Sequence, residues 1–322
     1  MMNLLQLTLS NQIPLQREGT IHDFKWQWLA EGILQCMPKQ NYTRSIVLSA
    51  GIHGNETAPI EILNQICLDL FQGKLKLKQR VLFILGNPLA IQNGVRYVEN
   101  DLNRMFGDHY RTLRSDQETQ RAELLEKLVT TFFQTDEHKS QRYHYDLHTA
   151  IRTSLLPTFA LLPYQQHPYD EDLLQSLNAA DLDALVYHNE TGKTFTHFSS
   201  EKFQAASATL ELGKAKPFGK NDLSQFSAIH RVLNGLLTQQ ELPTRSKDAI
   251  SIFKVVKSII KKSSDFKLNL HENAPNFSHF PAYTVIAIQD KAEDLLNHSV
   301  WILFPNKDVK IGLRAGLLLI KD

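Results

Sequence analysis

The stretch Ser45-Ile46-Val47-Leu48-Ser49-Ala50-Gly51-Ile52-His53-Gly54-Asn55-Glu56 joins an apolar run to a short glycine-containing loop. The apolar half is typical of a buried strand, and the loop comes where a following helix would begin. Only two residues separate His53 from Glu56. Imidazole nitrogen and carboxylate oxygen are both zinc ligands, so this loop can offer two ligands to one metal ion.

A third ligand is available further along the chain. The run Tyr145-Asp146-Leu147-His148-Thr149 closes another predicted strand and places His148 at its end. In open α/β sheets, ligands bind outside the carboxyl ends of the strands. The set His53, Glu56 and His148 leaves a fourth position for water, which is the ligand count of a catalytic zinc. Zinc would lower the pKa of that water to about 7.

Short apolar runs alternate with longer amphipathic segments between Ser45 and Leu237. This alternation predicts an α/β sheet with helices on both faces. Ser115-Asp116-Gln117-Glu118 has the form of a capping box, so we expect it to open a helix that runs towards Phe133. The predicted strands are 46–48, 81–85, 143–147, 158–162, 184–187 and 205–212, and the predicted helices are 60–70, 115–133, 170–180 and 223–237.

The pattern changes near Leu242-Pro243-Thr244-Arg245-Ser246. Short β-rich runs separated by turn residues and charges follow, at 250–256, 283–288, 300–304 and 316–320. We therefore expect a catalytic domain over residues 1–244 and a smaller, mostly-β C-terminal domain over residues 245–322.

The composition is that of an ordinary soluble globular protein. Thirty-five Lys and Arg against 34 Asp and Glu give a formal net charge of +1, which offers no electrostatic reason to expect a nucleic-acid or membrane partner. Cys36 and Cys67 form no C-x-x-C pair, so we expect neither a disulfide framework nor a cysteine zinc site. We find no signal peptide and no apolar run near the roughly 20 residues of a membrane helix, which makes a cytoplasmic location the default expectation.

Two carboxylates carry alternative interpretations. Asp146 lies two residues before His148, on the same side of a strand, so it either orients that imidazole or satisfies backbone donors at the strand end. Glu211 stands inside the apolar run Ala208-Thr209-Leu210-Glu211-Leu212-Gly213. It is either the general base of a zinc-water mechanism or an edge-strand residue that faces solvent.

The segment Arg96-Tyr97-Val98-Glu99-Asn100-Asp101-Leu102-Asn103-Arg104-Met105-Phe106 has neither helical nor strand periodicity. Arginine binds carboxylates bidentately and stabilises oxyanions. The segment is therefore either an anion-binding loop or a surface loop whose charges are solvated.

The ordered set H-G-N-E, R-Y with D-L-N-R, D-L-H-T and L-E-L-G resembles the succinylglutamate desuccinylase/aspartoacylase family, which is related to the zinc carboxypeptidases. The resemblance spans about residues 45–226. Three runs are similar to the desuccinylase members rather than to the aspartoacylases. These are Asp146–Arg152, Thr194–Ser199 and Thr209–Asp222.

The resemblance implies a zinc-carboxypeptidase-like mixed sheet flanked by helices and one zinc ion per subunit. It implies hydrolysis of N-succinyl-L-glutamate to succinate and L-glutamate, the last step of arginine breakdown by the succinyltransferase route. The zinc ligands that it implies are His53, Glu56 and His148. It further implies that Glu211 is the general base and then the acid. Arg96 would lie near the scissile carbonyl, and Asn103 and Arg104 would bind a substrate carboxylate.

One contact stays unassigned. Aspartoacylases carry a further substrate-binding arginine shortly before the catalytic glutamate, whereas Ser199-Ser200-Glu201-Lys202-Phe203 contains none. Lys202, Lys214 and Arg152 are the candidates to replace it.

The sequence leaves two other functions open. One is an aspartoacylase-like or carboxypeptidase-like zinc amidohydrolase with a different substrate, and the other is a zinc-binding sensor without catalysis. The second would require loss of the base, and Glu211 is present. We expect a small anionic substrate as the partner, and the sequence allows a homo-oligomer.

Overall fold

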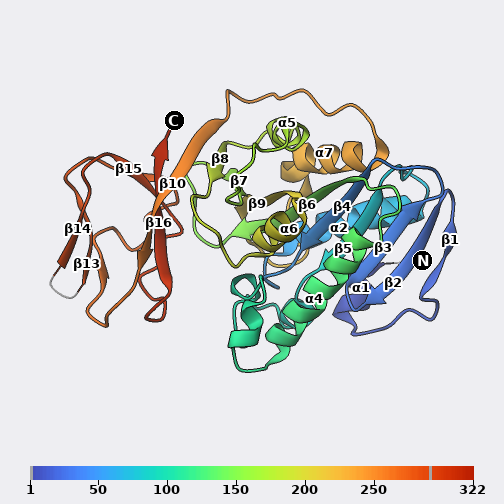
Figure 1. Cartoon of the computed structure of the whole chain (residues 1–322), viewed down its shortest axis with the longest axis horizontal. Helices are drawn as coiled ribbons and strands as arrows, with labels where there is room; N and C mark the ends of the chain where they lie inside the picture. The colour runs from blue at the N-terminus through green and yellow to red at the C-terminus, as the bar shows by residue number, and fades with distance from the viewer. Residues whose placement is uncertain (1–2, 290–291) are drawn as a thin grey trace.

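One mixed β-sheet runs through the computed structural model, which describes residues 3–289 and 292–322 (Figure 1). Its central strands β5, β4, β6 and β9 are parallel to one another, and β3 and β7 flank them in antiparallel orientation. The predicted mixed α/β architecture is thereby confirmed. The strand order is β1 (Glu18–Ile21), β2 (Phe24–Ala30), β3 (Ile33–Pro38), β5 (Arg80–Leu85), β4 (Arg44–Ala50), β6 (Gln141–Ala150), β9 (Ala206–Lys214), β7 (Thr158–Leu162), β8 (Ala184–Tyr187), β10 (Ser251–Ile260), β16 (Arg314–Lys321), β15 (Val300–Leu303) and β12 (Ser278–Phe280).

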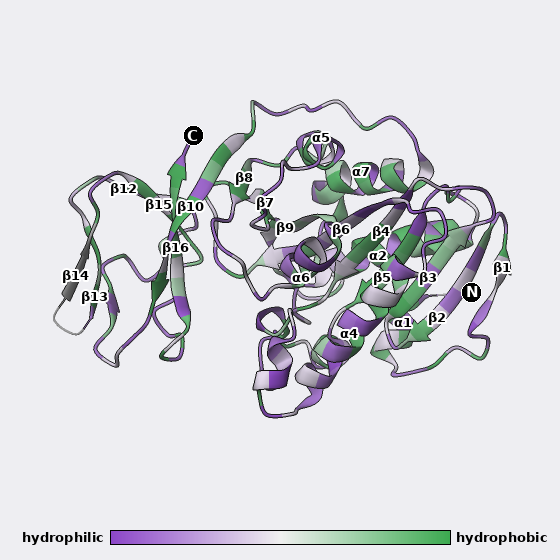
Figure 2. Ribbon diagram, viewed as in Figure 1, coloured by the Kyte–Doolittle hydropathy of each residue, from purple (hydrophilic) through white to green (hydrophobic). Residues whose placement is uncertain are grey.

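The central strands are apolar because helices cover both of their faces. Along β4, Ile46 and Leu48 face one hydrophobic core while Val47, between them, faces the other. All six residues of β5 are buried. Figure 2 shows these central strands mainly in the hydrophobic colour.

Two helical layers enclose the sheet. One core is formed with α2 (Thr57–Phe71), α5 (Glu171–Ala179) and α7 (Ser227–Thr238), together with the short α1 (Leu4–Leu9). The other is formed with α4 (Gln117–Gln134) and α6 (Phe195–Phe203). Over the described ranges, no helix has both the length and the apolar character needed to cross a bilayer.

The predicted capping box was wrong by one residue. Asp116, not Ser115, is the N-cap of α4: its carboxylate accepts from Thr119 N, and Thr119 Oγ1 accepts from Asp116 N, both at 2.7 Å. Glu118 is thereby free to turn inward and bind another loop. The predicted helix over 223–237 is also divided, into a 3₁₀ turn η3 (Leu223–Phe226) and α7.

The C-terminal residues are β-rich, as expected, and they extend the main sheet. β10 pairs in parallel with β8, and β16 then pairs antiparallel with β10. A second, three-stranded sheet contains β11 (Lys267–Leu268), β13 (Val285–Gln289) and β14 (Ala292–Leu295). The residues after 245 are therefore joined to the preceding α/β part by backbone hydrogen bonds and lie at one end of the molecule (Figure 1).

Candidate metal centre and active site

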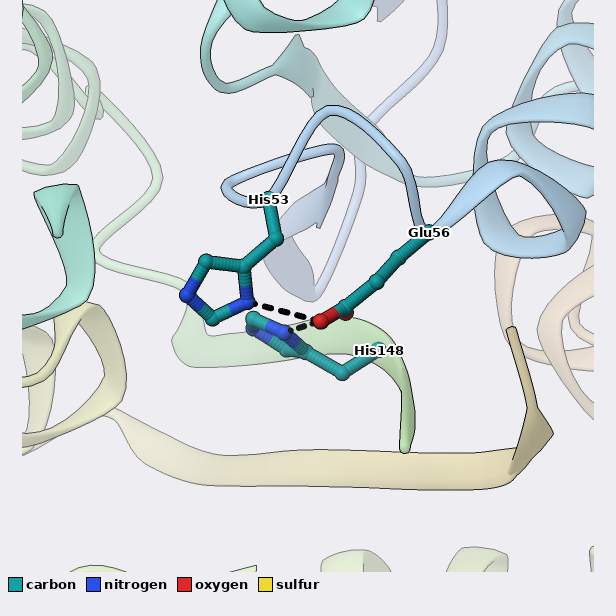
Figure 3. A group of neighbouring side chains, drawn as sticks. All are labelled: His53, Glu56 and His148. Carbon is teal, nitrogen blue, oxygen red and sulfur yellow. Dashed lines mark hydrogen bonds and ion pairs between the residues drawn. The ribbon is translucent and has the colours of Figure 1, made fainter. Parts of the chain in front are cut away.

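Two histidines and one glutamate converge at the carboxyl ends of β4 and β6. His53 lies in the loop after β4, Glu56 is the N-cap residue of α2, and His148 lies in β6. One ligand atom from each lies within 4.8 Å of the other two, and all three residues are buried. Figure 3 shows both imidazoles directed at the Glu56 carboxylate. The structure thus brings together the three predicted ligands.

The loop that carries His53 is held by a close approach of two backbones. Gly54 N donates to Arg96 O at 3.1 Å. A Cβ atom at Gly54 would lie 2.1 Å from the carbonyl carbon of Ala90, in α3 (Pro88–Asn93). Only glycine fits at this position, which explains why the residue after His53 has no side chain.

The ligand atoms fit a divalent metal ion. His53 Nδ1 lies 2.9 Å from Glu56 Oε1 but is a buried nitrogen with no hydrogen bond of good geometry. His148 Nδ1 lies 2.9 Å from Glu56 Oε2. Burial alone would raise the pKa of Glu56, but the two imidazoles hold it well below its usual range, so the carboxylate is ionised. Two nitrogens and an ionised oxygen form the donor set of a catalytic zinc site.

Two aspartates orient the imidazoles from the other side. His148 Nε2 lies 2.8 Å from Asp146 Oδ2, and Ser49 Oγ donates to Asp146 Oδ1 at 2.5 Å. His53 Nε2 lies 3.0 Å from Asp101 Oδ1. These contacts leave the Nδ1 atom of each ring for the metal. Of the two interpretations of Asp146, the structure supports the orienting one.

The role of Asp101 was not foreseen from the sequence. It is the N-cap of the 3₁₀ turn η1 (Leu102–Arg104), which holds its carboxylate in place through a 3.0 Å bond from Asn103 N. Its partner His53 is 48 residues away in the chain. The only available signal was chemical: a ligating histidine needs an acceptor for its outer nitrogen.

Glu211 lies directly beside the ligands because of strand register. β6 and β9 are paired in parallel, with His148 opposite Glu211. Glu211 is 8% exposed, and its Oε2 is a buried atom without a hydrogen-bond partner. Burial, followed by the nearby charge of Glu56, raises the pKa of Glu211 to about 7. A carboxylate with this pKa can accept and return a proton near neutral pH.

This raised pKa predicts a pH-dependent stability difference in metal-free protein. Folded Glu211 titrates at about 7 instead of its ordinary 4.5, so its ionisation costs stability as pH rises from 4.5 to 7, and the cost is complete above pH 7. We expect metal-free Glu211→Gln to have the same free energy of unfolding as the wild type below pH 4.5. At pH 8 its free energy of unfolding should be higher than that of the wild type by up to about 3 kcal/mol. Urea unfolding across this pH range measures the difference. A difference that does not change with pH would contradict the assignment.

Arg96 connects the predicted ligand Glu56 to the loop that follows Arg96. Its Nη1 donates to Glu56 Oε1 at 2.9 Å, and its Nη2 lies 3.7 Å from Asp101 Oδ2. The guanidinium is about one-third exposed, so part of it remains accessible. Of the two interpretations of the 96–106 segment, this contact favours a loop that belongs to the site.

Asn103 and Arg104 lie at the far end of the same loop. Asn103 is buried, and its Oδ1 accepts from Phe195 N at 3.0 Å, at the start of α6. Arg104 is exposed, and its Nη1 donates to Asn103 O at 2.9 Å. The side-chain oxygen of Asn103 is thus already hydrogen-bonded within the protein. The Arg104 guanidinium is held by its hydrogen bond to the backbone of the same turn.

Helix α4 fixes both ends of this loop through buried carboxylates. Glu118 is 1% exposed and accepts from Val98 N at 2.7 Å and from Glu99 N at 3.3 Å. Glu126 accepts from Gly107 N at 2.7 Å. The inward rotation of Glu118, made possible by the Asp116 cap, therefore serves to place Arg96 and its neighbours.

The three candidates for the unassigned carboxylate contact have different surroundings. Lys202 Nζ lies over the Phe198 ring, 5.4 Å from its centroid. Arg152 Nη1 donates to Glu272 O at 2.7 Å, in the C-terminal residues. Lys214 is exposed at the end of β9.

A family model described as the succinylglutamate desuccinylase/aspartoacylase catalytic domain matches residues 42–237. The chain belongs to this family and is therefore a hydrolase. A second model, described as the AstE/AspA barrel-sandwich hybrid domain, matches residues 248–322. The family expected from the motifs is confirmed.

Curated relatives and solved structures agree with this family. Succinylglutamate desuccinylases of Yersinia pestis (strain Pestoides F) and Yersinia pseudotuberculosis serotype O:1b (strain IP 31758) are each 52% identical over 322 residues, which cover 100% of this chain and 97% of theirs. The crystal structure of the Vibrio parahaemolyticus succinylglutamate desuccinylase is similar with a TM-score of 0.92 at 31% identity, over 99% of this chain and 94% of that one. For the Chromobacterium violaceum desuccinylase the TM-score is 0.86 at 35% identity, over 99% and 98%.

Proposed function

We propose that this protein hydrolyses the amide bond of N-succinyl-L-glutamate to give succinate and L-glutamate. The observation that carries the proposal is Glu211, a buried carboxylate with an unpartnered oxygen, placed beside His148 by the β6–β9 register. The names of the 52% identical relatives support the substrate.

We assign the zinc ligands as His53, Glu56 and His148. A zinc ion held by them would supply a water molecule of pKa near 7 for attack on the amide carbonyl. Glu211 takes the proton from the attacking water and then donates it to the nitrogen of the departing glutamate. The pKa of about 7 suits both halves of this transfer.

The two arginines act on opposite parts of the substrate. Arg96 donates to the oxyanion that develops at the carbonyl, for which its exposed edge is available. Arg104 and the amide nitrogen of Asn103 bind a substrate carboxylate. The three carboxylates of N-succinyl-L-glutamate require such local cations in a protein whose formal net charge is only +1.

We further propose that residues 1–244 form the catalytic domain and residues 245–322 a smaller domain beside it. The reaction would be the last step of arginine breakdown by the succinyltransferase route, in the cytoplasm. A homo-oligomer is compatible with the chain.

A comparison of three substrates tests the proposal. We expect kcat/KM for N-succinyl-L-glutamate to exceed that for N-acetyl-L-aspartate and for a short peptide by at least about 100-fold, because a pocket built for a charged group rejects analogues that leave it unpaired. Release of free amino groups, followed over time, measures all three. A preference for N-acetyl-L-aspartate or for the peptide would replace the proposed substrate with the one preferred.

A further inference from the structure

Arg314, the first residue of β16, has a guanidinium without a bound partner. Its side chain is half-buried. Over residues 3–289 and 292–322, no hydrogen bond or ion pair of this side chain to another residue is found. A half-buried cation that is left unpaired in the free protein is costly unless something else pairs with it.

The strand connections bring Arg314 to the loop at residues 188–194. Arg314 stands opposite Ile260, the last residue of β10, and β10 lies beside β8, which ends just before this loop. Ser258 Oγ, two residues before Ile260, donates to Glu190 Oε1 at 2.9 Å. The loop thus follows β10 as far as the start of β16.

The other side of the same loop contacts the segment that contains Arg104. Phe106 N donates to Lys193 O at 3.1 Å, and Phe195 N donates to Asn103 Oδ1 at 3.0 Å. The 188–194 loop therefore lies between β10 and η1. Arg314 and Arg104 lie on the two sides of this loop, near enough for the charge of Arg104 to lower the pKa of Arg314.

Neither Arg104 nor Arg314 forms an ion pair within the described part of the chain. Burial and the charge of Arg104 lower the pKa of Arg314 to about 10, against the opposing charges of Glu190 and Asp101, so Arg314 remains protonated at neutral pH. Asp101 is already bound to His53 and faces Arg96. Glu190 is exposed and hydrogen-bonded to Ser258.

The imidazoles nearby do not add to the charge. His188 and His197 stack edge to face, with ring centroids 5.1 Å apart. Burial lowers the pKa of His197 to about 4, so this ring is neutral. Among the described residues, the two guanidiniums therefore remain without a paired carboxylate, although Glu190 and Asp101 lie near enough to raise the pKa of Arg314.

We propose that Arg314 is a specificity-determining residue that binds one carboxylate of the substrate together with Arg104. This inference rests on the proposed function and deepens it. It assigns the contact for which the stretch before Glu211 offers no arginine, and it gives the C-terminal residues a direct part in substrate recognition. Two guanidiniums that share one carboxylate supply charge-assisted hydrogen bonds from both sides.

A cycle of variants and truncated substrates tests this proposal. The variants are Arg314→Ala and Arg314→Lys, and Lys310→Ala is the matched control, because Lys310 is an exposed cation in the preceding turn. The substrates are N-succinyl-L-glutamate and three analogues that each lack one carboxylate: N-butanoyl-L-glutamate, N-succinyl-L-norvaline and N-succinyl-4-aminobutyrate. Each is assayed at equal zinc content.

We expect Arg314→Ala to lower kcat/KM for the full substrate by about 100-fold, with Arg314→Lys between it and the wild type. On the one analogue that lacks the contacted carboxylate, the loss should shrink to less than about threefold, because the partner is already absent. On the other two analogues the loss should persist. Lys310→Ala should behave as the wild type throughout.

Two results would overturn the proposal: unchanged kinetics of Arg314→Ala on the full substrate, or an equal loss on all four compounds. If the alanine variant does not fold, Arg314→Lys carries the same comparison, because it keeps the charge but not the planar geometry. A wild-type protein that turns over none of these compounds would refute the proposed function itself, whereas an active wild type with an unaffected variant refutes only the role of Arg314.

Discussion

Replacement of Glu211 by alanine is expected to lower kcat for N-succinyl-L-glutamate by about 1000-fold or more while the zinc content stays at one ion per chain. Glu211 lies beside the ligands but is not one of them, since the convergent set consists of His53, Glu56 and His148. Its loss removes the proton acceptor and donor, which contributes about 10²–10⁴-fold, and also the group that orients the water. Zinc analysis and steady-state kinetics on the same preparation measure both quantities.

Two further variants make this result specific. Glu211→Gln keeps the shape and a hydrogen-bonding group but cannot accept a proton, so it should be almost as inactive as the alanine variant. Glu201→Gln removes a carboxylate from the exposed face of α6 and should leave the kinetics unchanged. Full activity in Glu211→Ala would show that another residue transfers the proton.

His148→Ala is expected to lose both the metal and the activity. His148 is 2% exposed and is fixed from two sides, by Glu56 at Nδ1 and by Asp146 at Nε2. Without it, two ligands remain, which is fewer than a catalytic zinc site uses. Turnover should fall by about 10⁴-fold or more, because a zinc ion held at this site would supply the activated water. The zinc affinity of purified protein, measured with a competing chelator, gives the direct readout.

Asp146→Asn provides the intermediate step of this series. It leaves all three ligands in place but weakens the contact that orients His148, so zinc affinity should fall by about 10- to 100-fold rather than vanish. His167→Ala, at an exposed position, is the matched histidine control. Stoichiometric, tightly bound zinc in His148→Ala would contradict the ligand set.

The sequence predicts the part of this site that depends on strand ends. The apolar run before His53 and the run that ends at His148 both carry a period and a composition typical of buried parallel strands, and parallel strands bring their carboxyl ends together. Glu211 could be singled out as a carboxylate in an apolar run. Its place opposite His148 could not be derived, because register is set by long-range pairing.

Contacts between distant loops were beyond sequence reasoning. Asp101 meets His53, and Arg314 approaches Arg104, only because separate segments fold against each other. The predicted capping box was wrong for a related reason. Ser115 and Asp116 can each serve as the N-cap, and Glu118 accepts hydrogen bonds from Val98 and Glu99 in another loop instead of completing the box. The continuation of the sheet from β8 into β10 likewise follows from pairing across the loop at 239–250.

The central claim, that one zinc ion at His53, Glu56 and His148 supports hydrolysis of N-succinyl-L-glutamate, is tested most directly by a zinc titration of the chelated protein. Complete chelation should abolish turnover of this substrate. Stepwise addition of zinc should restore it in proportion to the metal bound, with a break at one ion per chain. Turnover of N-succinyl-L-glutamate that survives complete removal of the metal would contradict the account.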